Sequence, residues 1–154
     1  TYKMTRGGAG YTAEDPYRIY LSNNSPAWVY VIGSDLSNAV SKVFPHDERT
    51  SAALFYKNND IALPDEEHLF ELDNTTGTTY NLVLYSQKEL DIDGLVEKLR
   101  AGGGDFAQKT RDAIGEDMVP FDEITLGRQN IKFSSKSEKP VVAIVVEIRH
   151  VGVR

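Results

Sequence analysis

The segment Pro140–His150 constrains the fold of this chain more than any other, because both of its alternating faces are apolar. One face carries Val142, Ile144, Val146 and Ile148, and the other carries Val141, Ala143 and Val145. Successive side chains of a strand point to opposite sides of the sheet, so such a strand is stable only where both sides are covered. β-Branched residues also favour strands. The segment therefore predicts a strand in the middle of a sheet.

Four further segments alternate with period two and predict additional strands. They are Tyr17–Leu21, Ala27–Ile32, Ala39–Phe44 and Thr78–Ser86. The segment centred on Trp28 is apolar on both faces, as is the one centred on Ile144. We expect these two segments to lie side by side as the inner strands of one hydrophobic layer.

The segments between these predicted strands and at the end of the chain show weaker patterns of secondary structure. Residues 46–60 are polar and mixed, which indicates a long irregular connection. Residues 73–77 contain the Asn, Thr and Gly residues typical of a hairpin turn. Residues 130–134 predict a short strand near the end of the chain.

Between residues 91 and 114 the apolar period changes from two to that of a helix. Ile92, Leu95, Val96 and Leu99 occupy one face of the first predicted helix. Gly102–Gly104 should end it, since glycine suits a left-handed C-terminal cap. Asp105 followed by Gln108 resembles a capping box that opens a second helix through Ile114.

The two predicted helices stand between strands rather than alternating with them, which argues against a parallel α/β sheet. We therefore predict a mainly β fold, a β-sandwich or barrel-like and largely antiparallel arrangement, with a two-helix insertion around residues 91–114. Residues 1–14 lack a hydrophobic period and predict a flexible N-terminal arm, whereas residues 15–154 predict a single β-rich domain. The start at Thr1 suggests an excised or processed piece of a longer protein.

The overall charge and composition exclude several partners. The formal net charge of −6 repels nucleic-acid backbones and anionic membranes, and the basic residues form no cluster. The absence of cysteine excludes disulfides and thiolate metal sites. The longest apolar run, Val141–Val146, is far shorter than the roughly 18 residues that cross a bilayer. We therefore expect no nucleic-acid partner and no direct membrane insertion.

No motif indicates catalysis or cofactor binding. The glycine run at residues 7–10 neither follows a strand nor opens a helix, so it lacks the context of a phosphate-binding loop. No Gly-x-Ser-x-Gly sequence is present to form a nucleophile elbow. The sequence predicts no catalytic residue, no cofactor-binding residue and no cofactor.

Two short segments, Pro45–Arg49 and Pro64–His68, each place a histidine among carboxylates directly after a proline. Imidazole and carboxylate are the ligands that a divalent metal takes when thiolates are absent. If the two loops met, a metal site could form from His46, Asp47, Glu66 and His68. No zinc-enzyme ligand spacing accompanies them, and the alternative is two solvated turns whose carboxylates cap backbone amides.

Aromatic residues raise a second alternative, a sugar-binding platform, because exposed rings in a row stack on sugars. Four aromatic residues lie in predicted strands, where packing explains them: Trp28, Tyr30, Tyr80 and Tyr85. Three others are expected to be more exposed: Tyr11, Tyr17 and Tyr56.

The order of several short motifs resembles a bacterial family, the domain-of-unknown-function 4384 family. The motifs are Tyr17–Leu21, Ala27–Ile32, Val43–His46, Ile61–Pro64, Thr76–Thr78 and Leu82–Ser86. The resemblance covers roughly residues 17–86 and implies an accessory module, since relatives are attached to caspase-like peptidases, protein kinases and envelope lipoproteins. It transfers no catalytic residue. It also implies that Phe44-Pro45 is a turn that defines the fold, which weakens a metal role for His46.

These observations lead to three hypotheses of function. The first is a non-catalytic binding or interaction module of a larger bacterial protein in the cell envelope or secreted, with another protein or neighbouring domains of the same chain as partner. The second is a metal-dependent hydrolase that uses the His46 and His68 loops. The third is a carbohydrate-binding module.

Overall fold

The computed structural model describes residues 2–4, 10–12, 14–23, 25–37, 39–54, 59–72, 75–126, 133–135 and 137–152. The fold is mainly antiparallel β with two helices, as the sequence predicts, and its sheets are not closed. The mainly antiparallel β fold is therefore confirmed, whereas the sheet order does not establish whether the arrangement is a sandwich or a barrel.

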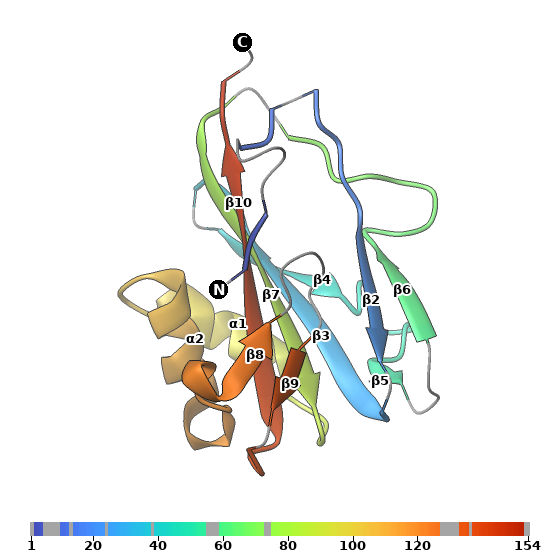
Figure 1. The fold of residues 1–154 in the computed structure, drawn as a ribbon, viewed down its shortest axis with the longest axis vertical. Helices are drawn as coiled ribbons and strands as arrows, with labels where there is room; N and C mark the ends of the chain where they lie inside the picture. Colours follow the sequence, from blue (N-terminus) through green and yellow to red (C-terminus); the bar gives the residue numbers. More distant parts are fainter. Residues whose placement is uncertain are drawn as a thin grey trace.

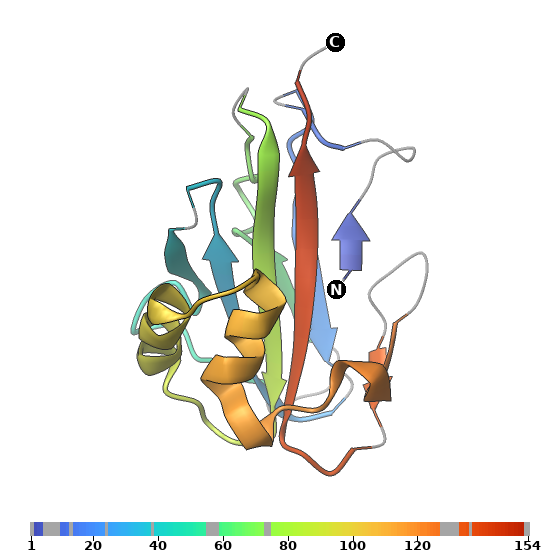
Figure 2. The same cartoon turned by 90° about the vertical axis from the view of Figure 1, so that its left-hand side faces the viewer.

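The largest sheet has six strands in the order β1-β10-β7-β3-β4, with β5 paired to β3 on the side of β4. The strands are β1 (Tyr2–Met4), β3 (Ala27–Ser34), β4 (Val40–Phe44), β5 (Ala53–Leu54), β7 (Gly77–Ser86) and β10 (Val141–His150). Only the β1–β10 pair of this sheet is parallel. Figure 2 shows β7 and β10 running along the length of the molecule, with β1 beside β10.

Strands β3 and β10 are both interior, which confirms the prediction from their two apolar faces. The prediction that they lie side by side is wrong, because β7 lies between them and pairs with both. Strand β7 is also apolar in its second half, where Leu82, Val83 and Leu84 are buried. Period two alone identifies an interior strand but not its neighbour, so the order of three such strands does not follow from their patterns.

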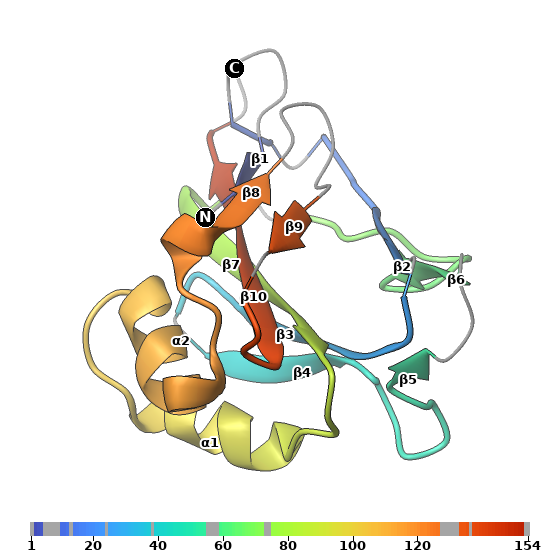
Figure 3. The ribbon, with the colours of Figure 1, turned by 60° about the horizontal axis from the view of Figure 1, so that its bottom comes forward.

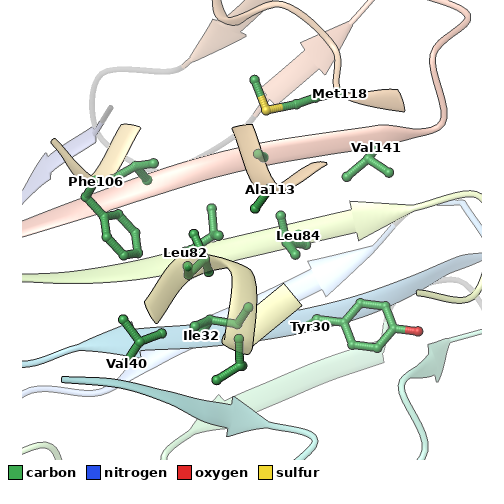
Figure 4. Packing of buried hydrophobic residues seen from close by; sticks show 13 residues of the cluster. Tyr30, Ile32, Val40, Leu82, Leu84, Phe106, Ala113, Met118 and Val141 are labelled. Carbon is green, nitrogen blue, oxygen red and sulfur yellow. The ribbon is translucent and has the colours of Figure 1, made fainter. Parts of the chain in front are cut away.

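Alternate residues of these strands fill two separate cores, one on each face of the sheet. The helix-covered face carries Tyr30, Ile32, Leu82, Leu84, Val141, Ala143 and Val145, and Figure 4 shows several of them beneath the helices. The opposite, ribbon-covered face carries Val29, Val31, Val83, Ile144, Val146 and Ile148. The predicted division of side chains between the two faces is therefore confirmed.

The helices α1 (Ile92–Ala101) and α2 (Phe106–Ile114) pack on the first face through Val96, Leu99 and Phe106. The Asp105 carboxylate accepts a hydrogen bond from the Gln108 amide, so the predicted cap is present. The Gln108 side chain donates to Asp112 instead of completing a capping box.

The glycines between the helices correct one expectation. Gly102 ends α1 with φ of −71°, an ordinary extended conformation rather than a left-handed one. The left-handed position is Gly104, with φ of +85°, in the link before α2. The glycine run therefore ends α1 as predicted, but glycine is required two residues later than the cap.

A two-stranded ribbon covers the other face, formed by β2 (Ile19–Asn23) and β6 (Asn59–Leu63). Figures 1 and 3 show the helices on one side of the large sheet and this ribbon on the other. Ile19, Leu21 and Leu63 point into the second core. The ribbon continues as a bridge between Tyr17 and Phe70, beyond which the pairing ends.

Other segments depart from the predicted pattern. The connection over residues 46–60 contains β5 and the start of β6, while residues 55–58 lie outside the described residues. A second ribbon pairs β8 (Ile124–Leu126) with β9 (Phe133–Ser135), and β9 includes residues 133 and 134 of the predicted strand, whereas residues 130–132 lie outside the described residues. Residues 73 and 74 of the predicted turn also lie outside the described residues. Short turns η1 (Gly115–Asp117) and η2 (Phe121–Glu123) link α2 to β8.

Part of the expected N-terminal arm is paired with the last strand. Tyr2–Met4 forms β1 along β10, and the Tyr11 amide donates to the Arg149 carbonyl at 2.8 Å. Thr1, residues 5–9 and Ala13 lie outside the described residues. The flexibility of this arm and a domain boundary at residue 15 stay predictions.

Candidate functional site

The two histidine loops of the predicted metal site are separate turns. In the first, Asp47 Oδ1 accepts hydrogen bonds from the Arg49 amide at 2.9 Å, the Thr50 amide at 2.9 Å and the Thr50 hydroxyl at 3.0 Å. The Thr50 hydroxyl bond is the main cause that lowers the pKa of Asp47 below its usual value. His46 is exposed, and its Nε2 lies 3.5 Å from Asp47 Oδ2. Asp47 therefore acts as a turn cap.

In the second turn the capping residue is Asp65, which the sequence did not single out. Its Oδ1 accepts from the amides of Glu67 at 2.8 Å and His68 at 2.7 Å. The bond from the His68 amide is the main cause that lowers the pKa of Asp65. His68 Nδ1 lies 2.8 Å from Asp65 Oδ2, and the side chain of His68 is exposed.

No group of three or more His, Asp or Glu side chains could hold a metal ion in the described part of the chain, which includes all four predicted ligands. Each histidine instead has a carboxylate of its own loop as neighbour: Asp47 for His46 and Asp65 for His68. Glu66 contributes its backbone carbonyl, which accepts from Arg18 at 3.0 Å. The geometry corresponds to the alternative of two capped turns.

The aromatic residues of the strands pack inward, as expected. Tyr30 is buried and its hydroxyl accepts from the Leu90 amide at 2.9 Å, while the ring of Tyr80 stacks on Phe106 at 5.1 Å. Trp28 and Tyr85 pack against the two cores. These rings therefore form no exposed platform.

The predicted exposure of Tyr11 and Tyr17 is wrong, because both are half-buried against the second core. The extension of β2 beyond its first residue places Tyr17 over the sheet, and Tyr11 packs beside it. Tyr56 lies outside the described residues. The exposed large hydrophobic side chains of the described part are instead Tyr20 and Leu69, at 60% and 43%.

A hollow of about 450 Å³ opens on the ribbon-covered face, where the ribbon has ended and the sheet continues. Its floor follows from the strand register. Ser41 in β4 pairs with Gly33 in β3, which pairs with Asn81 in β7. These three residues carry no large apolar side chain, so the second core is interrupted over β4, β3 and β7, and it resumes at Val146 of β10, which pairs with Asn81.

The floor contains buried polar side chains. Asn81 and His150 are each only 6% exposed, although they occupy core-facing positions of β7 and β10. Thr79 Oγ1 lies 3.0 Å from His150 Nε2 on the neighbouring strand. A buried amide, hydroxyl and imidazole are costly to desolvate unless they are hydrogen-bonded, so this end of the sheet is built differently from the apolar remainder.

Gly33 keeps this floor open. A Cβ atom at position 33 would lie 3.0 Å from Val43 Cγ2 and 3.5 Å from Asn81 Oδ1. Even a methyl group would therefore press on Val43 and lie against the Asn81 amide. The absence of a side chain at Gly33 leaves Asn81 facing the hollow.

One wall of the hollow is aromatic. Tyr17 and Phe70 exchange two backbone hydrogen bonds, of 3.0 and 2.8 Å, and their rings lie 5.1 Å apart. The ring of Tyr11 also packs on Tyr17, with the ring centroids 5.6 Å apart. Burial raises the pKa of Tyr17 to about 12, partly opposed by a hydrogen bond from the Asn81 side chain. Tyr17 therefore keeps its proton at neutral pH.

Carboxylates stand at the rim, from Asp35 and Glu71. Asp35 Oδ1 accepts from the Ser37 amide at 2.8 Å, the Ser37 hydroxyl at 2.7 Å and the Ala39 amide at 2.9 Å. The Ser37 hydroxyl bond is the main cause that lowers the pKa of Asp35. This carboxylate is therefore charged and held in position at neutral pH.

A sequence signal for this hollow exists, although the prediction missed it. Asn81 has the same parity in its strand as buried Val83, and His150 the same parity as buried Ile148. Polar residues at core-facing positions of otherwise apolar strands mark a place where the core ends. The contribution of Tyr17 and Phe70 has no such signal, because it depends on the pairing of distant segments.

Comparisons of this chain with protein-family models, curated proteins and solved structures gave no match. Within the described residues, the helices are too short and too polar to cross a bilayer.

Proposed function

We propose that this chain is a non-catalytic binding module and that the hollow on the ribbon-covered face is its binding site. The observation that carries this proposal is the floor of buried Asn81 and His150 under an opening of about 450 Å³. Ligand pockets of this size, roughly 300–1,000 Å³, typically combine apolar walls with a few fixed polar groups. The Tyr17–Phe70 wall and the Asn81–His150 floor provide both kinds of surface.

The module belongs, in this proposal, to a larger bacterial protein of the cell envelope or secreted, as the family resemblance implies. Its partner is another protein or a neighbouring domain that places a polar group in the hollow. The rigid sheet supports this role, because Gly33, Asn81 and Thr79 lie on paired strands rather than on loops. Sites built on strands need little reordering when a partner binds.

A binding experiment on the whole chain tests the proposal. Amide NMR spectra of the labelled protein are recorded with a mixture of small cationic, anionic and sugar fragments. We expect at least one fragment to shift the amide signals of Gly33, Thr79 and Asn81 together. If no fragment of any charge shifts these signals, the hollow is not a binding site and the proposal is wrong.

A glycine variant supplies the matched comparison. Gly33→Ala places a methyl group 3.0 Å from Val43 Cγ2 and against the floor, so it should weaken binding by about tenfold or more. Gly103→Ala is the control, because a Cβ atom there meets nothing within 4 Å. Equal binding by the two variants would contradict the proposal.

The non-catalytic part of the proposal has its own test, because Thr79 Oγ1 and His150 Nε2 lie at a distance that also suits a nucleophile and its base. We expect no turnover of nitrophenyl esters, phosphates or glycosides above that of the Thr79→Val variant. Turnover that is lost in Thr79→Val while the fold is retained would show that the module is an enzyme.

A further inference from the structure

The charge of the hollow distinguishes it from two other hollows of the described structure. Its ionisable rim groups are the carboxylates of Asp35 and Glu71, and no lysine or arginine occurs among its described lining residues. The other hollows contain cations beside their carboxylates, Lys42 and Arg100 in one and Lys88 and Lys98 in the other. Each of those two hollows has two cations beside three carboxylates, so its negative charge is partly neutralised, whereas the two carboxylates of this hollow have no lysine or arginine beside them among the described lining residues.

We infer that the hollow binds an organic ammonium group, supplied by a small amine or by a lysine side chain of a partner protein. This inference rests on the proposed function and names the chemistry of its ligand. The carboxylates of Asp35 and Glu71 attract the cation at the rim, and the Tyr17–Phe70 wall lies along the same opening.

The aromatic wall fits this chemistry in a second way. The face of an aromatic ring attracts a cation within about 6 Å, and it also packs on the methylene groups that carry an ammonium. Tyr17 is half-buried and its backbone is paired with Phe70, so the wall is in place before any ligand arrives. An aliphatic amine thus meets an apolar wall along its chain and carboxylates at its charged end.

The floor accepts hydrogen bonds from the same group. An ammonium has three donors and no acceptor, so its partners must offer oxygen atoms. Asn81 Oδ1 faces the space above Gly33, and the Ser41 hydroxyl lies in the same cross-strand row. An anionic ligand would instead meet the carboxylates of Asp35 and Glu71 without a compensating cation.

The experiment compares charged and uncharged probes of similar shape by NMR titration of the whole chain. The amine is n-butylammonium and its uncharged counterpart is n-pentanol. A short alanine peptide with one lysine, compared with the same peptide carrying norleucine, distinguishes a protein source from a free amine. We expect both cations to bind at least about tenfold more tightly than their uncharged partners, and salt to weaken the binding.

Two variants identify the carboxylates that act on the cation. Glu71→Gln removes one charge, and Asp35→Asn removes the other while keeping an oxygen that can accept the turn's hydrogen bonds. Each should weaken n-butylammonium binding by roughly threefold to tenfold. The control is Glu116→Gln, an exposed carboxylate outside the hollow, which should change nothing.

The outcomes separate this inference from the proposed function. Equal binding of n-butylammonium and n-pentanol, or unchanged amine binding in both carboxylate variants, would overturn the inference. A sugar or an anion that shifts the Gly33 and Asn81 signals while the amine does not would also overturn it and leave the binding site standing. If no fragment shifts these signals, both the inference and the proposed function fail.

Discussion

The two faces of the large sheet are covered to different extents, and this difference assigns a structural role to one face and a binding role to the other. The helix-covered face carries the first core, and α1 and α2 pack over Ile32, Leu82 and Leu84. The ribbon-covered face carries the second core, which β2 and β6 cover in part, and Gly33, Asn81 and His150 interrupt this face at the hollow. A face that is covered throughout serves stability, whereas the uncovered polar end of the other face is free to bind a partner.

The largest expected effect tests whether the helix-covered face is purely structural. Leu84 is 0% exposed, so Leu84→Ala should lower the free energy of unfolding by about 2–5 kcal/mol, through lost burial and the cavity left behind. Chemical denaturation measures this change, and ligand binding in the hollow should stay the same under folding conditions. Leu69→Ala, at a position 43% exposed, is the control and should cost at most about 0.5 kcal/mol. A loss below about 1 kcal/mol for Leu84→Ala would contradict a packed core on this face.

The next prediction concerns the ribbon-covered face at high pH. Burial raises the pKa of Tyr17 and of Tyr85 to about 12 from a reference value of 10.0. Between these pH values the unfolded chain releases the phenol protons while the folded chain keeps them, so stability is full below pH 10 and falls as the pH rises toward 12. The loss should be about 2 kcal/mol per tyrosine.

Denaturation at about pH 9 and about pH 12 measures this loss, and Tyr17→Phe should remove its own share. Tyr20→Phe is the matched control, since Tyr20 is 60% exposed. A pH dependence that is the same in the Tyr17→Phe and Tyr20→Phe variants would show that Tyr17 is not packed on the second face.

A smaller effect tests how the helices are held on their face. The Asp105 carboxylate caps α2 by accepting from the Gln108 amide at 2.8 Å, so Asp105→Ala should cost about 1 kcal/mol of unfolding free energy. Asp105→Asn keeps an oxygen acceptor and should cost much less. Equal losses in the two variants would mean that the charge, rather than the cap, matters.

The smallest effect concerns the hollow beside α1, where Lys42 Nζ lies 3.3 Å from Asp93 Oδ1. Ion pairs of this exposed kind contribute about 0–1 kcal/mol. A double-mutant cycle with Lys42→Met and Asp93→Asn should give a coupling energy below about 1 kcal/mol that decreases with salt. A larger coupling energy would contradict this prediction, because it would mean that the Lys42–Asp93 ion pair stabilises the fold as much as a buried contact does.

The alternation of the long strands was predictable because it arises from local geometry. The parity of Tyr30 and Ile32 in β3, and of Ile144 and Val146 in β10, assigned each side chain to the correct face. The insertion of β7 between β3 and β10 was not predictable, since strand order depends on contacts between segments far apart in the chain. The short strands β5 and β8 carry too few residues to show a period.

The site was less predictable than the fold. His46 and His68 stood out because histidine beside carboxylate is a known ligand pattern, yet each is accounted for by its own turn. Asn81 and His150 were detectable only as polar interruptions of apolar strands. The position of Tyr17 in the wall of the hollow depends on where the ribbon ends, and no local pattern in the sequence determines that.

The most direct test of the central claim is a crystal structure of the full chain with n-butylammonium. We expect the amine in the hollow, with its chain against Tyr17 and Phe70 and its nitrogen toward the carboxylates of Asp35 and Glu71. An amine bound only on the helix-covered face, or residues of the chain itself filling the space above Gly33 and Asn81, would contradict the account.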